Sequence, residues 1–165
     1  MSLPSWAVVT PERRAHIERV VALLSSWAAA RRTPEGERAR WLTAGWLHDA
    51  LRDAPAANEL EHGPLAAERA ARDGEADQGV LDAVRYHSLG YARWDDVGKM
   101  LYLADYPEPG RVFDRDLRAA LAARVPVDRD GVLQQVAARR ITRVIDGRWP
   151  LPRETVDFWN ALVGY

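Results

Sequence analysis

Apolar residues recur at three- and four-residue spacing along most of this chain, the spacing that places side chains on one face of an α-helix. The stripe is clearest near the start, where it consists of Ile17, Val20, Val21, Leu24 and Ala28. No stretch of convincing length alternates apolar and polar residues with the two-residue period of a strand, and the sequence has no internal repeat or low-complexity linker. We therefore predict an all-α fold, a single helical bundle.

Capping and turn residues divide the chain into helices. The first should begin at Thr10-Pro11-Glu12, since a hydroxyl cap, a proline in the first turn and an acid near the positive end of the helix dipole all favour a helix start. The same signal returns at Thr33-Pro34-Glu35, and glycines and prolines mark most of the breaks. The predicted helices cover approximately 11–30, 35–51, 62–73, 76–87, 94–105, 114–124, 128–146 and 152–163.

Length and composition suit one domain with a sizeable core, because the chain has 165 residues and is 47% hydrophobic. We predict a single domain over 1–165, in which 1–111 carries the functional site and 112–165 supplies supporting helices. Lys and Arg total 23 against 24 Asp and Glu, a formal net charge of −1, so nothing favours nucleic acid or an anionic membrane as a partner. A bound phosphate would have to be held by local groups.

The sequence lacks membrane-targeting segments and cysteine, and each lack limits what the protein can be. The first ten residues show neither the basic leader nor the apolar core of a signal peptide, and no stretch approaches the roughly 20 apolar residues of a membrane span. We therefore expect a cytoplasmic protein. The chain has no cysteine, which removes disulfides, thiolate metal sites and cysteine nucleophiles. Any metal would be bound by nitrogen and oxygen.

Several ionisable residues lie beside or at the ends of the predicted apolar helical faces. They are His16, His48, Asp49, His87 and Asp105, and the remaining histidine, His62, lies where a helix is predicted to begin. Burying such groups without partners is costly. A divalent cation satisfies several of them at once, with neutral imidazoles as ligands and carboxylates balancing the charge. We therefore predict one shared metal site inside the bundle.

Each of these residues also has an ordinary structural explanation. The pair His48-Asp49 is weak by itself, because a His-Asp dipeptide arises easily by chance. A lone histidine at a core border, such as His16, is more often a hydrogen-bonded core residue. Asp105 could bond a backbone amide at a helix end, and His62 could simply begin a helix. The joint pattern favours the metal, since all four histidines lie in the first two-thirds of the chain.

This arrangement resembles the HD-domain phosphohydrolases and, within them, the YqeK-type symmetrical diadenosine tetraphosphate hydrolases. The resemblance covers nearly the whole chain. Its elements are His16, His48-Asp49, His62-Gly63, Tyr86-His87-Ser88 and the block Ala104-Asp105-Tyr106-Pro107-Glu108-Pro109-Gly110-Arg111. The last block is the most specific, and the segment from Pro152 to Thr155 followed by Asn160 is similar to the C-terminal end of the family.

The resemblance implies a metal centre of one or two divalent ions. The first ion would be held by His16, His48, Asp49 and Asp105. Asp49 would bridge to a second ion held by His62 and His87. Iron is the expected metal, with manganese, cobalt or zinc as alternatives, because a site made only of nitrogen and oxygen does not select sharply among them.

The resemblance also suggests catalytic and substrate-binding residues. Asp49 would position the attacking water, and Arg52, Lys99 and Arg111 would bind phosphates and stabilise the departing nucleotide. The chain departs from the family in having Arg52 where a lysine is usual and Ser88 where a threonine is preferred. Arginine keeps the positive charge but is a poor proton donor, so Arg52 suits phosphate binding better than proton transfer.

We expect the substrate to be a dinucleoside polyphosphate, with diadenosine tetraphosphate and water giving two ADP. One alternative keeps the site but changes the substrate to a nucleoside monophosphate or a cyclic nucleotide. Another is a non-catalytic helical module that binds a nucleotide or a partner, an idea that the seven tryptophans invite. Trp149 and Trp159, however, lie in segments that we expect to pack. The protein would be a monomer or a homodimer.

Overall fold

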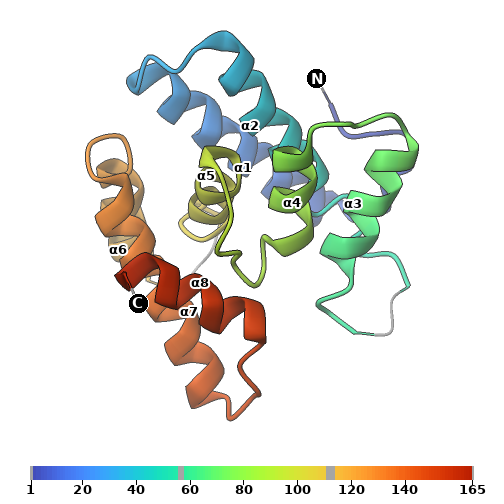
Figure 1. The fold of residues 1–165 in the computed structure, drawn as a ribbon. Helices are drawn as coiled ribbons and strands as arrows, with labels where there is room; N and C mark the ends of the chain where they lie inside the picture. Colours follow the sequence, from blue (N-terminus) through green and yellow to red (C-terminus); the bar gives the residue numbers. More distant parts are fainter. Residues whose placement is uncertain (1, 56–57, 111–113, 165) are drawn as a thin grey trace.

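The computed structural model describes residues 2–55, 58–110 and 114–164, and every regular element in these ranges is an α-helix (Figure 1). The prediction of an all-α fold is therefore confirmed. The helices are α1 (Pro11–Ala30), α2 (Glu35–Leu47), α3 (His62–Arg72), α4 (Gln78–Tyr86), α5 (Asp96–Asp105), α6 (Arg115–Arg124), α7 (Arg129–Asp146) and α8 (Arg153–Val163). None of the helices in the described ranges has the length and apolar character to cross a membrane.

Side-chain caps set several of the helix starts. Thr10, Asp77 and Asp95 each accept a hydrogen bond from a backbone amide in the first turn of α1, α4 and α5, respectively. These bonds satisfy amides that have no partner inside the helix. The cap also explains why α5 begins at Asp96 rather than at the predicted Trp94, because Asp95 is extended and lies outside the helix.

α2 ends at Leu47, four residues before the predicted boundary. Beyond it the backbone forms tight turns in which the amides of Ala50, Arg52 and Ala54 each bond the carbonyl three residues back. The segment before α1 stabilises these turns, since the amide of Val8 donates to the carbonyl of Ala50 at 2.8 Å. His48 and Asp49 therefore lie in the turn that follows α2, where both side chains are buried.

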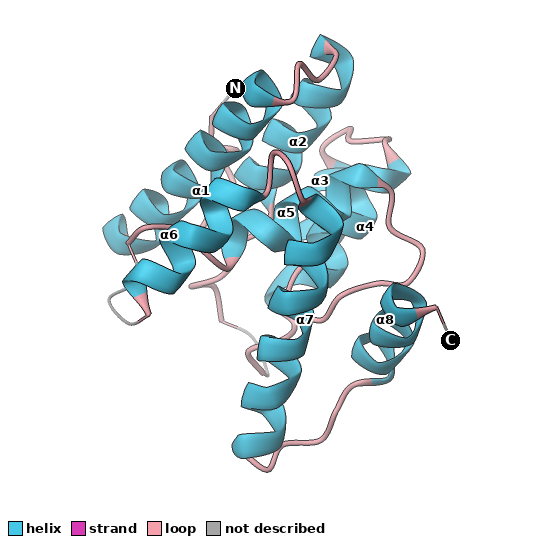
Figure 2. Cartoon of the chain, turned by 90° about the vertical axis from the view of Figure 1, so that its left-hand side faces the viewer, coloured by secondary structure: helices cyan, strands magenta, loops and turns pink. Residues whose placement is uncertain are grey.

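α5 is the central helix of the fold and contacts α1, α2, α4 and α7 (Figures 1 and 2). Nearly all of its residues are buried, including the apolar run from Met100 to Ala104. The rings of Trp94, Tyr102 and Phe158 contact one another with centroids 5.2–5.6 Å apart, which packs α8 against α5. The C-terminal end of α5, where Asp105 lies, is thus enclosed by helices from both parts of the chain.

Candidate metal centre

Six buried ionisable side chains from separate segments meet inside the bundle. α1 contributes one of them and the turn after α2 contributes two, while the start of α3, the residue after α4 and the end of α5 contribute one each. They are His16, His48, Asp49, His62, His87 and Asp105. The structure brings together all six residues that the sequence suggested as ligands, and we call this set the histidine–aspartate cluster.

Asp49 lies between two pairs of imidazoles. Its Oδ1 atom is 3.2 Å from Nε2 of His62 and 3.4 Å from Nε2 of His87. Its Oδ2 atom is 3.6 Å from Nε2 of His16 and 3.7 Å from Nε2 of His48. Potential ligand atoms of His16, His48 and Asp49 lie within 4.8 Å of one another, and so do those of Asp49, His62 and His87. One carboxylate therefore faces two potential metal positions.

Asp105 extends the group that contains His16. Its Oδ1 atom lies 3.2 Å from Nε2 of His16, and its Oδ2 atom accepts a hydrogen bond of 2.8 Å from Nη2 of Arg140 on α7. The guanidinium of Arg140 also lies over the ring of Tyr102, 4.3 Å from its centroid. Arg140 thereby orients the carboxylate while leaving its other oxygen directed at the imidazole.

Hydrogen bonds on the far side of the rings fix which nitrogen is available. The Nδ1 atoms of His48, His62 and His87 each lie 2.6–2.8 Å from the backbone carbonyl three residues earlier. A carbonyl only accepts, so each Nδ1 carries the proton and donates. In a neutral ring with this tautomer, Nε2 has no proton and carries a lone pair. The Nε2 atoms of all three rings point into the cluster.

This donor set fits divalent cations. The Nε2 atoms of His62 and His87 are 3.0 Å apart, and those of His16 and His48 are 3.4 Å apart, with Asp49 oxygens beside both pairs. An imidazole that is neutral with its proton on Nδ1 presents a lone pair, so it and the carboxylate that it faces are both acceptors and repel each other. A cation between them converts that repulsion into coordination by nitrogen and oxygen, and the Nδ1 bonds are the usual orienting contacts of metal-bound histidine.

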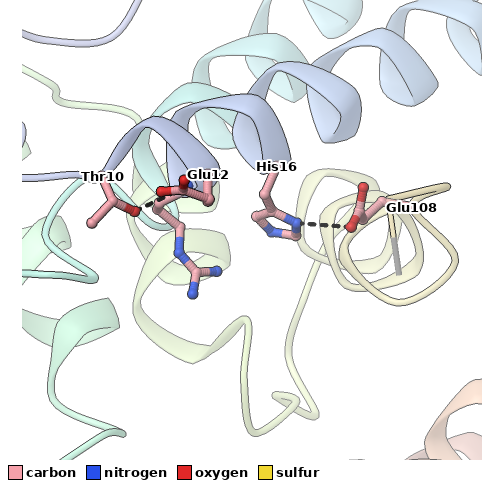
Figure 3. A pocket seen from close by; sticks show the side chains of 5 residues that line it. Thr10, Glu12, His16 and Glu108 are labelled. Carbon is pink, nitrogen blue, oxygen red and sulfur yellow. Dashed lines mark hydrogen bonds and ion pairs between the residues drawn. The ribbon is translucent and has the colours of Figure 1, made fainter. Parts of the chain in front are cut away.

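Glu108 is a further buried residue of this region, and it is not among the site residues predicted from the sequence. Its Oε1 atom lies 3.4 Å from Nδ1 of His16 (Figure 3). Its Oε2 atom accepts a hydrogen bond of 2.5 Å from Nε of Arg19. Glu108 therefore does for His16 what backbone carbonyls do for the other three histidines. Glu108 could have been suggested from the sequence, because it lies three residues after Asp105 in the most specific block of the family resemblance.

Charge neighbours determine the ionisation of the carboxylates. Burial alone would raise the pKa of Asp49, but the surrounding imidazoles of His48, His62 and His87, which favour the carboxylate whenever they carry a proton on Nε2, hold it well below its ordinary value. Burial likewise opposes ionisation of Asp105, yet the contacts with His16 and Arg140 hold its pKa well below the ordinary value. Both carboxylates are therefore anionic at neutral pH and suited to balance cationic charge.

The imidazoles His16 and His48 differ in their surroundings. Complete burial lowers the pKa of His48 to about 4, so this ring is neutral at physiological pH and its Nε2 lone pair is free to coordinate. Burial also acts to lower the pKa of His16, but hydrogen bonds to Asp105 and Glu108 outweigh it and raise the value to about 9. His16 without a metal would thus carry the positive charge that its acidic neighbours favour.

A large cavity of about 1140 Å³ adjoins the cluster. Asp49, His62, His87 and Asp105 form part of its wall, so the cluster is accessible from the cavity. Further parts of the wall come from the loop before α3, from α1, α5, α6 and α7, from the segment after α4, and from residues 149–155 at the start of α8. Trp149 lies on this wall and is 60% exposed, so the expectation that it packs inside the C-terminal helices is wrong.

The predicted phosphate-binding residues have different positions. Arg52 lines the cavity, and its guanidinium lies 3.8 Å from the carboxylate of Glu59. Lys99 is partly exposed on α5 and is not among the described residues that line the cavity. Arg111 lies outside the described residues. A further cavity residue, Arg13, was missed: its Nη1 atom donates to Oδ2 of Asp49 at 2.7 Å.

A histidine–aspartate cluster inside a helical bundle is typical of the α-helical proteins that build metal sites from inward-facing side chains. The HD domain family model matches residues 13–115, which include all six cluster residues, and the chain belongs to this family. The resemblance noted in the sequence is therefore confirmed.

Three curated relatives are named bis(5'-nucleosyl)-tetraphosphatase, symmetrical. The protein of Bacillus subtilis (strain 168) is 43% identical over 56 residues, which are 33% of this chain and 30% of the relative. That of Halalkalibacterium halodurans is 29% identical over 107 residues, 64% and 56% of the two chains. That of Staphylococcus aureus is 27% identical over 106 residues, 62% and 54%. The matched part of this chain thus spans between about a third and just over half of these relatives.

The fold has a counterpart among solved structures. A crystal structure from Clostridium acetobutylicum, described as a predicted HD superfamily hydrolase involved in NAD metabolism, superposes with a TM-score of 0.80. The superposition covers 94% of this chain and 91% of that chain at 22% sequence identity. At this identity the likeness supports the fold and does not extend to the substrate.

Proposed function

We propose that this protein is a metal-dependent phosphohydrolase that cleaves dinucleoside polyphosphates symmetrically, with diadenosine tetraphosphate and water giving two ADP. The observation that carries this proposal is the histidine–aspartate cluster in the wall of a cavity of about 1140 Å³. Small-molecule pockets usually measure roughly 300–1,000 Å³. A cavity above that range has room for a ligand with two nucleosides, and the names of the curated relatives support the same substrate class.

The cluster would hold one or two divalent ions. His16, His48, Asp49 and Asp105 would bind one, and His62 and His87 would bind the other, with Asp49 between them. Such ions, when bound, lower the pKa of a coordinated water and bind phosphate oxygens. Iron is the metal that we propose first, with manganese, cobalt and zinc as alternatives for an all-nitrogen-and-oxygen site.

The residues of the chain would orient the reacting groups. Asp49 is anionic at neutral pH and would accept a hydrogen bond from the attacking water, which holds the water against the phosphorus. Water attacks one of the two central phosphorus atoms, the bond from that phosphorus to the central bridging oxygen breaks, and the oxygen leaves with the second ADP. Arg13 and Arg52 would bind the oxygens of the phosphates on which charge develops. That Lys99 and Arg111 also bind phosphate oxygens stays a prediction from the sequence.

Product analysis tests the reaction directly. The purified protein, loaded with iron or manganese, would be incubated with diadenosine tetraphosphate and the products separated by chromatography. We expect ADP alone, and ATP plus AMP would contradict symmetrical cleavage. Asp105→Asn should reduce the rate by about 100-fold or more, because it removes an anionic ligand of the proposed metal. Asp157→Asn, which removes an exposed carboxylate of α8, serves as the matched control.

A substrate panel and a metal assay separate the alternatives. Preferred turnover of a nucleoside monophosphate or a cyclic nucleotide would keep the metal chemistry but replace the substrate. A binding module without catalysis need contain no metal, so elemental analysis of the protein as purified is the simplest discriminator. Protein without metal that also gains no hydrolytic activity on metal addition would contradict the enzymatic proposal.

A further inference from the structure

Two arginines on the cavity wall have no partner within the described part of the chain. The cavity is lined by six arginines: Arg13, Arg52, Arg118, Arg139, Arg140 and Arg143. Four of them are engaged. Arg13 bonds Asp49, Arg52 contacts Glu59, Arg140 bonds Asp105, and Arg118 bonds the carbonyl of Tyr106. Arg139 and Arg143 are exposed.

Arg139 and Arg143 place their positive charges on the same face of α7. They are four residues apart on α7, so their side chains project one turn apart from the same side of the helix. Like charges at this spacing repel and destabilise a helix. Asp114 and Asp146 also line the cavity, but neither forms an ion pair with Arg139 or Arg143. An anion bound between the two guanidinium groups would relieve this repulsion, and phosphate oxygens match their planar forks.

An exposed aromatic ring lies on the same wall. Trp149 is 60% exposed, follows α7 by three residues and is succeeded by Pro150, which also lines the cavity. A large apolar ring left in contact with solvent on a cavity wall provides a stacking platform for another planar group. Nucleobases stack on such rings with little dependence on which base is present.

We propose that Arg139 and Arg143 bind phosphate groups of the part of the nucleotide that lies away from the histidine–aspartate cluster, and that Trp149 stacks on its base. This subsite rests on the proposed function only in that the ligand is a nucleotide. It adds residues beyond 111, in the region expected to give only support, to the substrate-binding surface.

Calorimetric titration of the metal-loaded protein with ADP and with inorganic tripolyphosphate tests the subsite. Arg139→Gln/Arg143→Gln should raise the dissociation constants of both ligands by about tenfold or more, because charge-assisted hydrogen bonds to phosphate are lost. Trp149→Ala should raise the dissociation constant of ADP by about tenfold. That of tripolyphosphate should stay within about twofold of the wild-type value, because only the nucleotide has a base to stack. Arg14→Gln/Arg32→Gln, which removes two exposed arginines that do not line the cavity, should match the wild type.

The outcomes separate this inference from the proposed function. Wild-type affinity of Arg139→Gln/Arg143→Gln for both ligands would overturn the phosphate role, even in a protein that hydrolyses diadenosine tetraphosphate. Equal weakening of ADP and tripolyphosphate by Trp149→Ala would overturn the stacking role. The arginine variant could bind both ligands more weakly while the wild type hydrolyses no dinucleoside polyphosphate. That result would support the subsite and contradict the proposed function. Retained affinity in Arg139→Lys/Arg143→Lys would support a role for charge.

Discussion

The Nε2 atoms of His62 and His87 lie 3.0 Å apart, and Oδ1 of Asp49 lies 3.2 and 3.4 Å from them, so the three atoms form a compact triangle. Because their Nδ1 atoms are committed to backbone carbonyls, these rings cannot turn their protons toward each other. We expect His87→Ala to remove one metal ion per chain and Asp49→Asn to reduce occupancy of both positions. Elemental analysis of protein equilibrated with manganese or iron measures this. Unchanged metal content in both variants would contradict the assignment of the ligands.

Removal of the metal should also lower stability. A ligand that binds only the folded state at about 100 times its dissociation constant stabilises it by about 2.7 kcal/mol. We therefore expect a chelator to lower the melting temperature of the wild type and to have a smaller effect on Asp49→Asn. Differential scanning calorimetry with and without the chelator gives the comparison, and an equal shift in both proteins would argue against binding at Asp49.

Glu108 should act through His16 and not on the substrate. Its carboxylate accepts from Nδ1 of His16, and its pKa is lowered to about 2 despite burial, because His16, Arg19 and the amide of Gly110 all bond it. Loss of such an orienting carboxylate typically weakens metal binding by about 10- to 100-fold. We expect Glu108→Gln to show that loss in a chelator-competition assay.

The neighbouring residue Glu12 provides the control for this variant. Glu12 and Glu108 line the same small cavity of about 220 Å³ beside His16, but only Glu108 contacts the ring (Figure 3). Glu12→Gln should therefore keep wild-type metal affinity. If both variants lost affinity equally, the effect would be the loss of negative charge near the site and not the bond to His16.

Gly63 allows α3 to approach α4 closely beside the cluster. A Cβ atom at this position would lie 2.8 Å from the carbonyl oxygen of Arg85 and 2.9 Å from that of Val84, and neither backbone atom can move without shifting α4. Gly63→Ala should therefore destabilise the protein by about 1–3 kcal/mol, the usual cost of overpacking. It should also weaken metal binding at His62 and His87, since it separates the segments that carry them.

A second helical glycine, Gly36, controls for the loss of glycine itself. Nothing lies within 4 Å of a Cβ atom built there. Gly36→Ala should leave stability unchanged or raise it by up to about 1 kcal/mol, because alanine restricts the unfolded chain and favours a helix. Chemical denaturation of both variants makes the comparison. Equal stability of Gly63→Ala and Gly36→Ala would show that the α3–α4 contact has room to adjust.

The sequence was informative where local rules decide the structure. The Thr10-Pro11 cap and the apolar stripe placed α1 at its observed bounds, 11–30. The cluster could be anticipated because ionisable groups at the ends of apolar faces must find partners in the interior. The end of α2 was misplaced because it depends on a backbone bond between Val8 and Ala50, which are far apart along the chain.

Contacts between distant segments were beyond sequence reasoning. Arg140 and Asp105 are separated by 35 residues and lie on different helices, so no spacing rule connects them. Arg13 could have been found, because it lies one turn before His16 on the same face of α1. Trp149 was expected to pack, and only the three-dimensional structure shows its ring exposed on the cavity wall.

Arg40 stabilises the scaffold around the site by joining α2 to the caps of two other helices. Its guanidinium bonds both oxygens of Asp77, the cap of α4, at 2.7 and 3.0 Å, and the carboxylate of Asp95, the cap of α5, at 2.6 Å. The bonds from Arg40 lower the pKa of Asp77 below its ordinary value of 3.8. A carboxyl whose pKa is lower in the folded state stabilises the fold above the unfolded pKa and loses that contribution as the pH falls through the folded one.

We therefore expect Asp77→Asn to cost up to about 1 kcal/mol of unfolding free energy at pH 7, since the pair is partly exposed and screened. Asparagine keeps the cap of α4, so the loss reports the ion pair and not the helix start. The difference between wild type and variant should stay constant down to about pH 4 and shrink below it, as the carboxyl of the folded wild type becomes protonated. Urea denaturation from pH 7 to pH 3 measures it. A difference that grows on acidification would contradict a lowered pKa, because that trend requires the folded state to favour the protonated carboxyl.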